Sequence, residues 1–85
     1  MQEDTQEEDL AELLKKTTGR KIKQIREGKG LTQQEVAVKV GVESDSQIRK
    51  WERGIRFPEP RNLVRLARAL EVRVMELFDF TDSDL

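Results

Sequence analysis

The stretch SDSQIRKWERG, residues 44–54, combines hydroxyl, amide and cationic side chains at spacings that suit a two-faced helix. Ile48 and Trp51 are three residues apart, so on a helix they share one face. The other face would carry Ser46, Gln47, Arg49, Lys50 and Arg53. Amide and guanidinium groups can meet purine edges in pairs, and the major groove of DNA admits a helix. The stretch therefore raises the question whether this helix touches nucleic acid.

The composition excludes several kinds of chemistry. The 85 residues include no cysteine and no histidine, so disulfides, the usual zinc sites and Ser–His or Cys–His nucleophile pairs are ruled out. No paired carboxylates or phosphate loop stand out, and we expect neither an enzyme nor a cofactor, a metal site or a small-molecule ligand. The N-terminus does not resemble a signal peptide and no apolar run approaches membrane-spanning length, so we expect a cytoplasmic protein with no membrane partner.

Charge is unevenly distributed along the chain. Residues 1–18 contain six acids and two lysines, and residues 79–85 contain three aspartates. Residues 19–78 contain fourteen Lys/Arg against eight Asp/Glu, so a basic middle lies between acidic ends although the net charge is −1. The electric field at a binding face depends on such local charge rather than on the total. We therefore divide the chain into an acidic extension (1–18), a basic domain (19–78) and an acidic tail (79–85).

The apolar spacing predicts an all-α domain of five short helices. Ile22, Ile25 and Leu31 face inward, and Gly28 and Gly30 close the first helix. The second begins at an N-cap with a capping box and ends at a glycine; its signals are Thr32, Glu35, Val36, Ala37, Val40 and Gly41. The third is the helix of residues 44–54. Pro60 opens the fourth, whose apolar face is Leu63, Leu66, Ala67 and Leu70, and Val72, Val74, Leu77 and Phe78 indicate a short fifth.

The N-terminal extension allows more than one structure. Leu10, Leu13 and Leu14 form a narrow apolar stripe after a capping-box spacing at Thr5 and Glu8. The segment can be a short helix of its own, a lengthening of the next helix, or a frayed tail. The sequence from Thr17 to Gly19 weakens a continuous helix but does not forbid it.

Two short helices joined by a glycine turn are the arrangement of a helix-turn-helix. Over residues 19–78 the sequence strongly resembles the Cro/phage-repressor (Xre) family. The matching stretches are GRKIKQIREGKGLTQQEVAVKVGV, IRKWERG and FPEPRNLVRLARALEV followed by ELF. This resemblance implies a compact lambda-repressor-like domain that binds double-stranded DNA.

The sequence departs from the family pattern at three places. Gly41 and Ile48 are seven residues apart where the family usually has six, so the turn holds one extra residue and Ser44, Asp45 or Ser46 can cap the third helix. Glu71 stands where the family normally has glycine, which costs about 1 kcal/mol if the position is left-handed. Arg73 replaces the usual Ser or Thr cap of the last helix.

The resemblance implies roles for the polar residues of the third helix. The base-reading positions become Asp45, Ser46 and Lys50, with Ser44 near a phosphate. Lys50 can reach guanine, whereas Asp45 either accepts from cytosine or only complements the helix dipole. Gln47 either closes a capping box with Ser44 or joins the base-reading set.

Phosphate contacts are expected around this helix. Gln33 and Gln34 open the second helix, whose N-terminus offers free N–H groups, and the family pattern makes Gln33 a phosphate contact that can bridge to the reading helix. Further candidates are cationic, and each can equally be a solvated charge: Lys29, Lys39, Arg49, Arg53 and Arg56. The resemblance also pairs Arg26 with Glu52 as a partly buried structural ion pair, and it places Trp51 in the core.

Modules of this kind usually bind two-fold sites as dimers. Met75, Phe78 and Phe80 are the first choice for a homodimer interface, and the leucines of the extension are the second. The sequence therefore predicts a sequence-specific regulator of transcription, a repressor on an inverted repeat. The alternative is an antitoxin-like or adaptor module on the same fold, whose acidic ends bind a protein.

Overall fold

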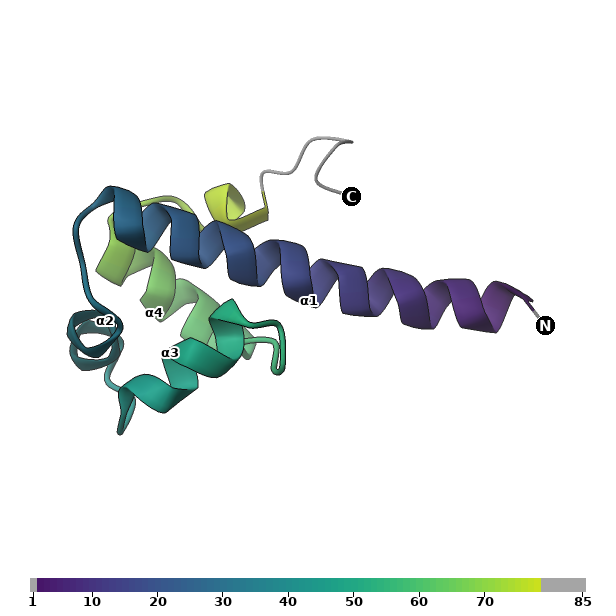
Figure 1. Cartoon of the computed structure of the whole chain (residues 1–85). Helices are drawn as coiled ribbons and strands as arrows, with labels where there is room; N and C mark the ends of the chain where they lie inside the picture. Colours follow the sequence, from purple (N-terminus) through teal and green to yellow (C-terminus); the bar gives the residue numbers. More distant parts are fainter. Residues whose placement is uncertain (1, 79–85) are drawn as a thin grey trace.

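A single long helix, α1 (Gln2–Gly28), runs across the whole width of the molecule in Figure 1. The computed structural model describes the backbone of residues 2–78 and the side chains of residues 7–78. The second half of α1 packs on the rest of the domain, whereas its first half extends beyond the other helices (Figure 1). The longest dimension is accordingly 43 Å, against 25 and 18 Å in the other two directions.

Thr17, Thr18 and Gly19 lie inside α1, so the extension and the predicted first helix are one element. The Thr17 hydroxyl donates to the carbonyl oxygens of Leu13 (2.9 Å) and Leu14 (3.1 Å), which satisfies it within the helix. Gly19 is a site of close approach, because a Cβ there would collide with the carbonyl oxygens of Trp51 and Glu52. The boundary predicted at residue 18 thus falls within a helix whose Thr17 and Thr18 are buried.

Two eight-residue helices follow, α2 (Gln33–Val40) and α3 (Asp45–Glu52). Thr32 and Glu35 form the predicted capping box: the Thr32 N–H donates to Glu35 Oε1 (2.8 Å) and the Glu35 N–H to Thr32 Oγ1 (3.0 Å). These bonds satisfy orphan donors at the start of α2. Gly41 ends the helix with φ +91°, the left-handed conformation that suits glycine.

The chain closes with α4 (Pro60–Leu70) and a 3₁₀ helix, η1 (Val74–Phe78). Pro60 is in the first turn of α4, as predicted. Glu71 caps α4 in the left-handed region at φ 58°, ψ 45°, so the position that the family fills with glycine is strained here. Arg73 offers no side-chain N-cap; instead its backbone N–H donates to Glu76 Oε2 (2.8 Å).

The prediction of five short helices is wrong in two respects. Within residues 2–78 the structure has four α-helices, because the last helical segment, Val74–Phe78, is a five-residue 3₁₀ helix, the tighter form that occurs in short pieces. The first helix is also long, with 27 residues. The all-α class itself is confirmed for the described residues, in which no strand occurs.

The core lies where α1, α2, α3, α4 and η1 meet. α2 packs on α3 and α4, α1 packs on α3 and η1, and η1 also contacts α4. The buried apolar side chains are Ile22, Val36, Ala37, Val40, Ile48, Trp51, Leu66, Ala67, Leu70 and Leu77. This core fixes α3 by one face and leaves the other face uncovered.

Candidate nucleic-acid interface

The turn between α2 and α3 accommodates its extra residue without disturbing the start of α3. Ser44 is the N-cap, with extended φ and ψ, and its hydroxyl accepts from the backbone N–H of Ser46 (3.3 Å). The Ser44 and Ser46 hydroxyl oxygens are 2.7 Å apart and share a hydrogen bond. Of the three possible caps, Ser44 therefore takes the role, and Asp45 and Ser46 are the first two residues of the helix.

α3 is divided into a core face and an outer face. Ile48 is fully buried and Trp51 is 4% exposed. Gln47, Lys50 and Arg53 are exposed, and Ser46 and Arg49 are half-buried. The polar groups expected to touch nucleic acid therefore lie together on the outer side of one helix, which is the arrangement that direct readout needs.

Asp45 is engaged within its own helix. Its Oδ2 accepts from Arg49 Nη2 at 3.2 Å, an i,i+4 ion pair with both side chains about two-fifths exposed. An acid in the first turn and a cation in the last turn also complement the helix dipole. The geometry thus favours the dipole interpretation of Asp45 over a base contact, and it ties Arg49 to the same pair.

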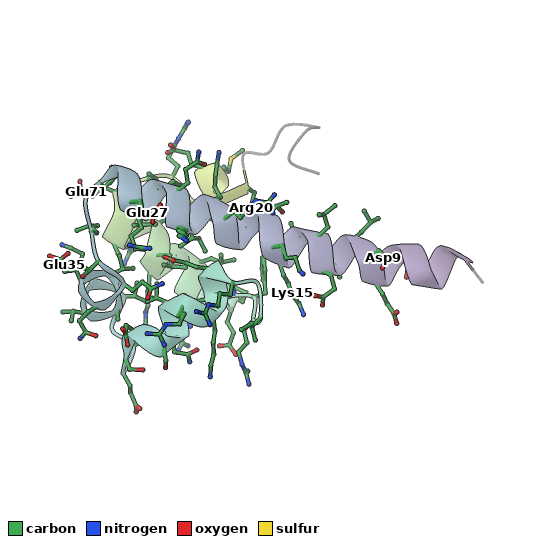
Figure 2. The ribbon with its side chains drawn as sticks, in the orientation of Figure 1. Asp9, Lys15, Arg20, Glu27, Glu35 and Glu71 are labelled. Carbon is green, nitrogen blue, oxygen red and sulfur yellow. The ribbon has the colours of Figure 1, made fainter. Side chains whose placement is uncertain are left out.

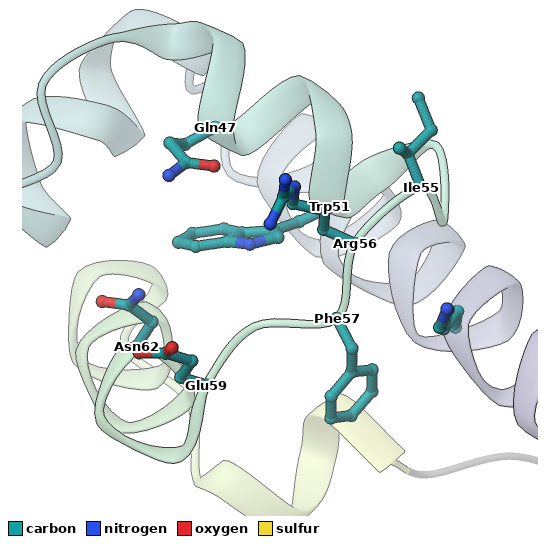
Figure 3. Close-up of a pocket in the computed structure, with 8 residues that line it drawn as sticks. Gln47, Trp51, Ile55, Arg56, Phe57, Glu59 and Asn62 are labelled. Atoms are coloured by element: carbon teal, nitrogen blue, oxygen red, sulfur yellow. The ribbon is translucent and has the colours of Figure 1, made fainter.

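Gln47 does not close a capping box, since the Ser44 hydroxyl takes its hydrogen bond from Ser46. The Gln47 side chain lies over the indole of Trp51 (Figure 3). Together with Ser46 and Lys50 it lines a shallow groove at the helix-turn-helix turn, which Gly41, Val42, Glu43 and Ser44 complete. Of the two roles left open for Gln47, the one beside the base-reading residues fits this placement.

A hydrogen-bonded network joins α1, α2 and α3 beneath this face. Arg26 Nε donates to Glu52 Oε2 at 2.6 Å and Arg26 Nη2 to Glu52 Oε1 at 3.1 Å, with both side chains at least nine-tenths buried. Arg26 Nη1 also donates to the Leu31 carbonyl (2.8 Å). The bonds to Glu52 outweigh the effect of burial and raise the pKa of Arg26 above its ordinary value, so the guanidinium stays charged.

The same network orients Gln33, the first residue of α2. Gln33 Nε2 donates to Glu52 Oε1 at 3.0 Å, so the amide that was expected to contact a phosphate is already held against α3. Its second N–H is not used in that bond, and an amide has two such donors. Gln34, Lys29, Lys39, Arg53 and Arg56, the other phosphate candidates beside Arg49, are all exposed.

A pocket of about 580 Å³ opens beside α3, and no sequence pattern predicts it (Figure 3). Its lining comes from α1, α3, the following loop and α4: Lys15, Gln47, Trp51, Ile55, Arg56, Phe57, Glu59 and Asn62. Apart from Trp51, which was predicted in the core, five of the lining residues are not among the predicted site residues: Lys15, Ile55, Phe57, Glu59 and Asn62. No local sequence signal points to them, because the elements that form the pocket are far apart in the chain.

The predicted dimer residues do not share one environment. Met75 is 80% exposed, whereas Phe78 is half-buried and stacks on Phe57 with ring centroids 6.2 Å apart. Phe80 lies outside the described residues. Met75 and Phe78 line a small hollow with Arg73 and Glu76.

This arrangement of α2, α3 and their turn is that of a helix-turn-helix protein, and comparison with known proteins agrees. The helix-turn-helix family model matches residues 22–77, and the chain belongs to this family. The resemblance to Cro/phage-repressor proteins is thereby confirmed. Within residues 2–78, no helix is long and apolar enough to cross a membrane.

Two curated relatives are similar over most of their length. An uncharacterized HTH-type transcriptional regulator of Archaeoglobus fulgidus is 37% identical over 65 residues, covering 76% of this chain and 91% of the relative. Another from Sinorhizobium fredii is 39% identical over 70 residues, covering 82% and 90%.

Two solved structures share the fold. The restriction-modification controller protein C.AhdI from Aeromonas hydrophila has a TM-score of 0.72 and 34% identity, covering 80% of this chain and 98% of that one. The clp gene regulator ClgR from C. glutamicum has a TM-score of 0.72 and 26% identity, covering 76% and 83%.

Proposed function

We propose that this chain is a transcriptional repressor that binds an inverted repeat in double-stranded DNA as a homodimer. In this proposal α3 enters the major groove, Ser46, Gln47 and Lys50 meet base edges, and Gln33 meets a phosphate. Repression follows from occupation of the operator. Ser44, Gln34, Lys29, Arg53 and Arg56 supply further phosphate contacts that position the protein without carrying sequence information.

The observation that carries the proposal is the outer face of α3. The core holds this helix by Ile48 and Trp51 and leaves Gln47 and Lys50 in solvent, next to a half-buried Ser46. A short helix with this face, beside a helix N-terminus, suits one half-site of duplex DNA. One half-site gives few base contacts, which is why we propose two copies with Met75 and Phe78 in their contact.

The test is selection from a random duplex library, followed by a salt titration on the recovered sequence. The proposal predicts an inverted repeat with half-sites about one helical turn apart, and an affinity that falls steeply with salt. If no shared motif emerges and binding is weak at moderate salt, the proposal fails. The acidic ends would then be the place to search for a protein partner of an antitoxin-like or adaptor module.

Two variants distinguish contacts to base edges from contacts to phosphates. Lys50→Ala should lose about 1–3 kcal/mol on the recovered operator and relax the base preference at one half-site position. Gln33→Ala should weaken binding to all duplexes alike. Arg68→Ala in the last turn of α4 removes an exposed cation outside the helix-turn-helix and serves as the charge-matched control. Equal losses for Lys50→Ala and Arg68→Ala would remove Lys50 from the reading set.

A further inference from the structure

The first half of α1 leaves an apolar stripe exposed on a helix that projects from the domain. We call residues 2–14 of α1 the arm, and Figure 1 shows the start of α1 projecting from the domain. The arm carries Leu10, Leu13 and Leu14. Leu10 is 62% and Leu14 40% exposed, whereas Thr17, seven residues after Leu10 and so on the same face, is buried. One face of α1 is thus covered within the domain and uncovered on the arm.

The stripe points away from the reading helix. Gly19 marks the side of α1 that touches α3, because a Cβ at Gly19 would meet the carbonyl oxygens of Trp51 and Glu52. Leu10 precedes Gly19 by nine residues, two and a half turns at about 3.6 residues per turn. Leu10 and Gly19 therefore lie on opposite sides of α1.

α1 has opposite charge in its two halves. The arm contains six acids and no cation, whereas residues 15–28 contain six cations and one acid. Asp9 lies on the projecting part of the helix, far from Glu35 and Glu71 (Figure 2). Asp9 and Lys16 are seven residues apart, so they lie on one flank of the leucine stripe, and both are exposed.

We propose that the arms of two copies of this chain pack against each other in antiparallel orientation through their leucine stripes. With the leucines of the two copies opposed, antiparallel packing brings Asp9 of one copy beside Lys16 of the other, and both side chains are exposed. Parallel packing would instead bring Asp9 beside Asp9 and place one acidic arm along the other. Charge complementarity therefore fixes both the partner, a second copy, and its direction.

The acidic tail of the same chain (79–85) suits the leucine stripe less well than a second copy does. Residues 79–85 carry three aspartates, and every charged residue of the arm is an acid. Packing the tail on the arm would bring like charges together, which is unfavourable at short range.

This contact differs in kind from the proposed operator dimer. Since each stripe faces away from its own α3, two copies joined by their arms carry their reading helices on opposite outer sides of the pair. They cannot contact the two half-sites of one short inverted repeat. Arm pairing instead joins copies bound to separate DNA segments, and this consequence rests on the proposed function, whereas the pairing itself does not.

The first test is the self-association of the full chain without DNA, by sedimentation equilibrium over a concentration series. Leu10→Ser with Leu14→Ser should weaken association about tenfold or more, while Val38→Ser, an equally exposed aliphatic residue on α2, should leave it unchanged. Asp9→Lys alone and Lys16→Asp alone should weaken it, and the two together should restore it. The proposal is overturned if the leucine and charge variants associate as strongly as the unsubstituted chain. It is also overturned if no association is detected at any concentration of the series.

The second test is DNA bridging. A biotinylated duplex carrying the selected operator is immobilised, and capture of a second, fluorescent duplex is measured with the full chain. The leucine variant should lose capture while its affinity for a single duplex stays within about twofold of the unsubstituted chain. Undiminished capture by that variant would refute the bridging role. If the chain binds no duplex but still associates through its arms, the proposed function is wrong and arm pairing is supported.

Discussion

Glu71 has a backbone conformation that favours glycine. Its φ of 58° lies in the left-handed region, which disfavours every residue with a Cβ. Glu71→Gly should raise the free energy of unfolding by about 1 kcal/mol, a rise in Tm of about 4–8 °C for a domain of this size. Thermal unfolding followed by circular dichroism measures it. Glu71→Ala removes the charge but keeps the Cβ, and an equal gain from that variant would show that strain is not the cause.

The capping box of α2 makes stability depend on pH. Hydrogen bonds from Thr32, first from its backbone N–H and then from its hydroxyl, lower the pKa of Glu35. A carboxyl whose pKa is lower in the folded chain than in the unfolded chain stabilises the fold. The full stabilisation is present above the unfolded pKa, about 4.3, and it is lost as the pH falls through the folded pKa. Glu35→Gln should therefore lower the Tm at pH 6, and the gap to the unsubstituted chain should narrow between pH 4 and pH 2. A gap that does not change with pH would contradict this.

The buried pair of Arg26 and Glu52 should be costly to break from one side. Arg26→Met leaves the Glu52 carboxylate buried without its main partner, and the free energy of unfolding should fall by about 3–5 kcal/mol in urea titrations. Arg26→Met combined with Glu52→Leu should recover much of that loss, because no unpaired charge remains. Lys23→Met, at an exposed position of α1, is the control. If the double variant is no better than Arg26→Met, packing rather than charge governs this site.

Among the elements, the crossing of α1 and α3 depends on the absence of a side chain at Gly19. A Cβ there would lie 2.6 Å from the Glu52 carbonyl oxygen. Gly19→Ala should therefore destabilise the fold by about 1–3 kcal/mol or more, as overpacking does. Gly28→Ala, in the same helix but with nothing within 4 Å of its Cβ, should be neutral or mildly stabilising. Similar unfolding free energies for the two variants would refute the close approach.

The sequence predicted those elements whose signals are local. The capping box at Thr32, the glycine end at Gly41 and the proline start at Pro60 each act within one turn, so α2 and α4 were placed correctly. The sequence does not decide whether α1 is continuous, because whether Gly19 interrupts a helix or admits a neighbour depends on where α3 lies. The pocket containing Lys15 and Asn62 was missed for the same reason: its walls come from three helices and a loop far apart in sequence.

At the scale of the whole molecule, the folded unit and the arm divide within α1. Residues 7–12 have exposed side chains, whereas Thr17 and Thr18 are buried. Removal of residues 1–9 should leave the Tm of the chain, measured at low concentration, within about 2 °C. Removal of residues 1–18 should lower the stability by more than about 2 kcal/mol, because buried packing is lost. Equal effects of the two truncations would place the boundary of the folded unit elsewhere.

The close contact of α1 with α3 also has a mechanical consequence. α1 is a rod about 40 Å long at about 1.5 Å per residue, and it crosses α3 near Gly19, with Gly54 lying against Lys16. A force applied at the free tip acts through a lever of about 25 Å on that crossing. The two glycines leave no compressible side chain between the rod and the end of α3. If two copies pair through α1 on DNA as proposed, tension between them acts on this crossing and changes the angle at which α3 would enter the groove, and with it the affinity for DNA.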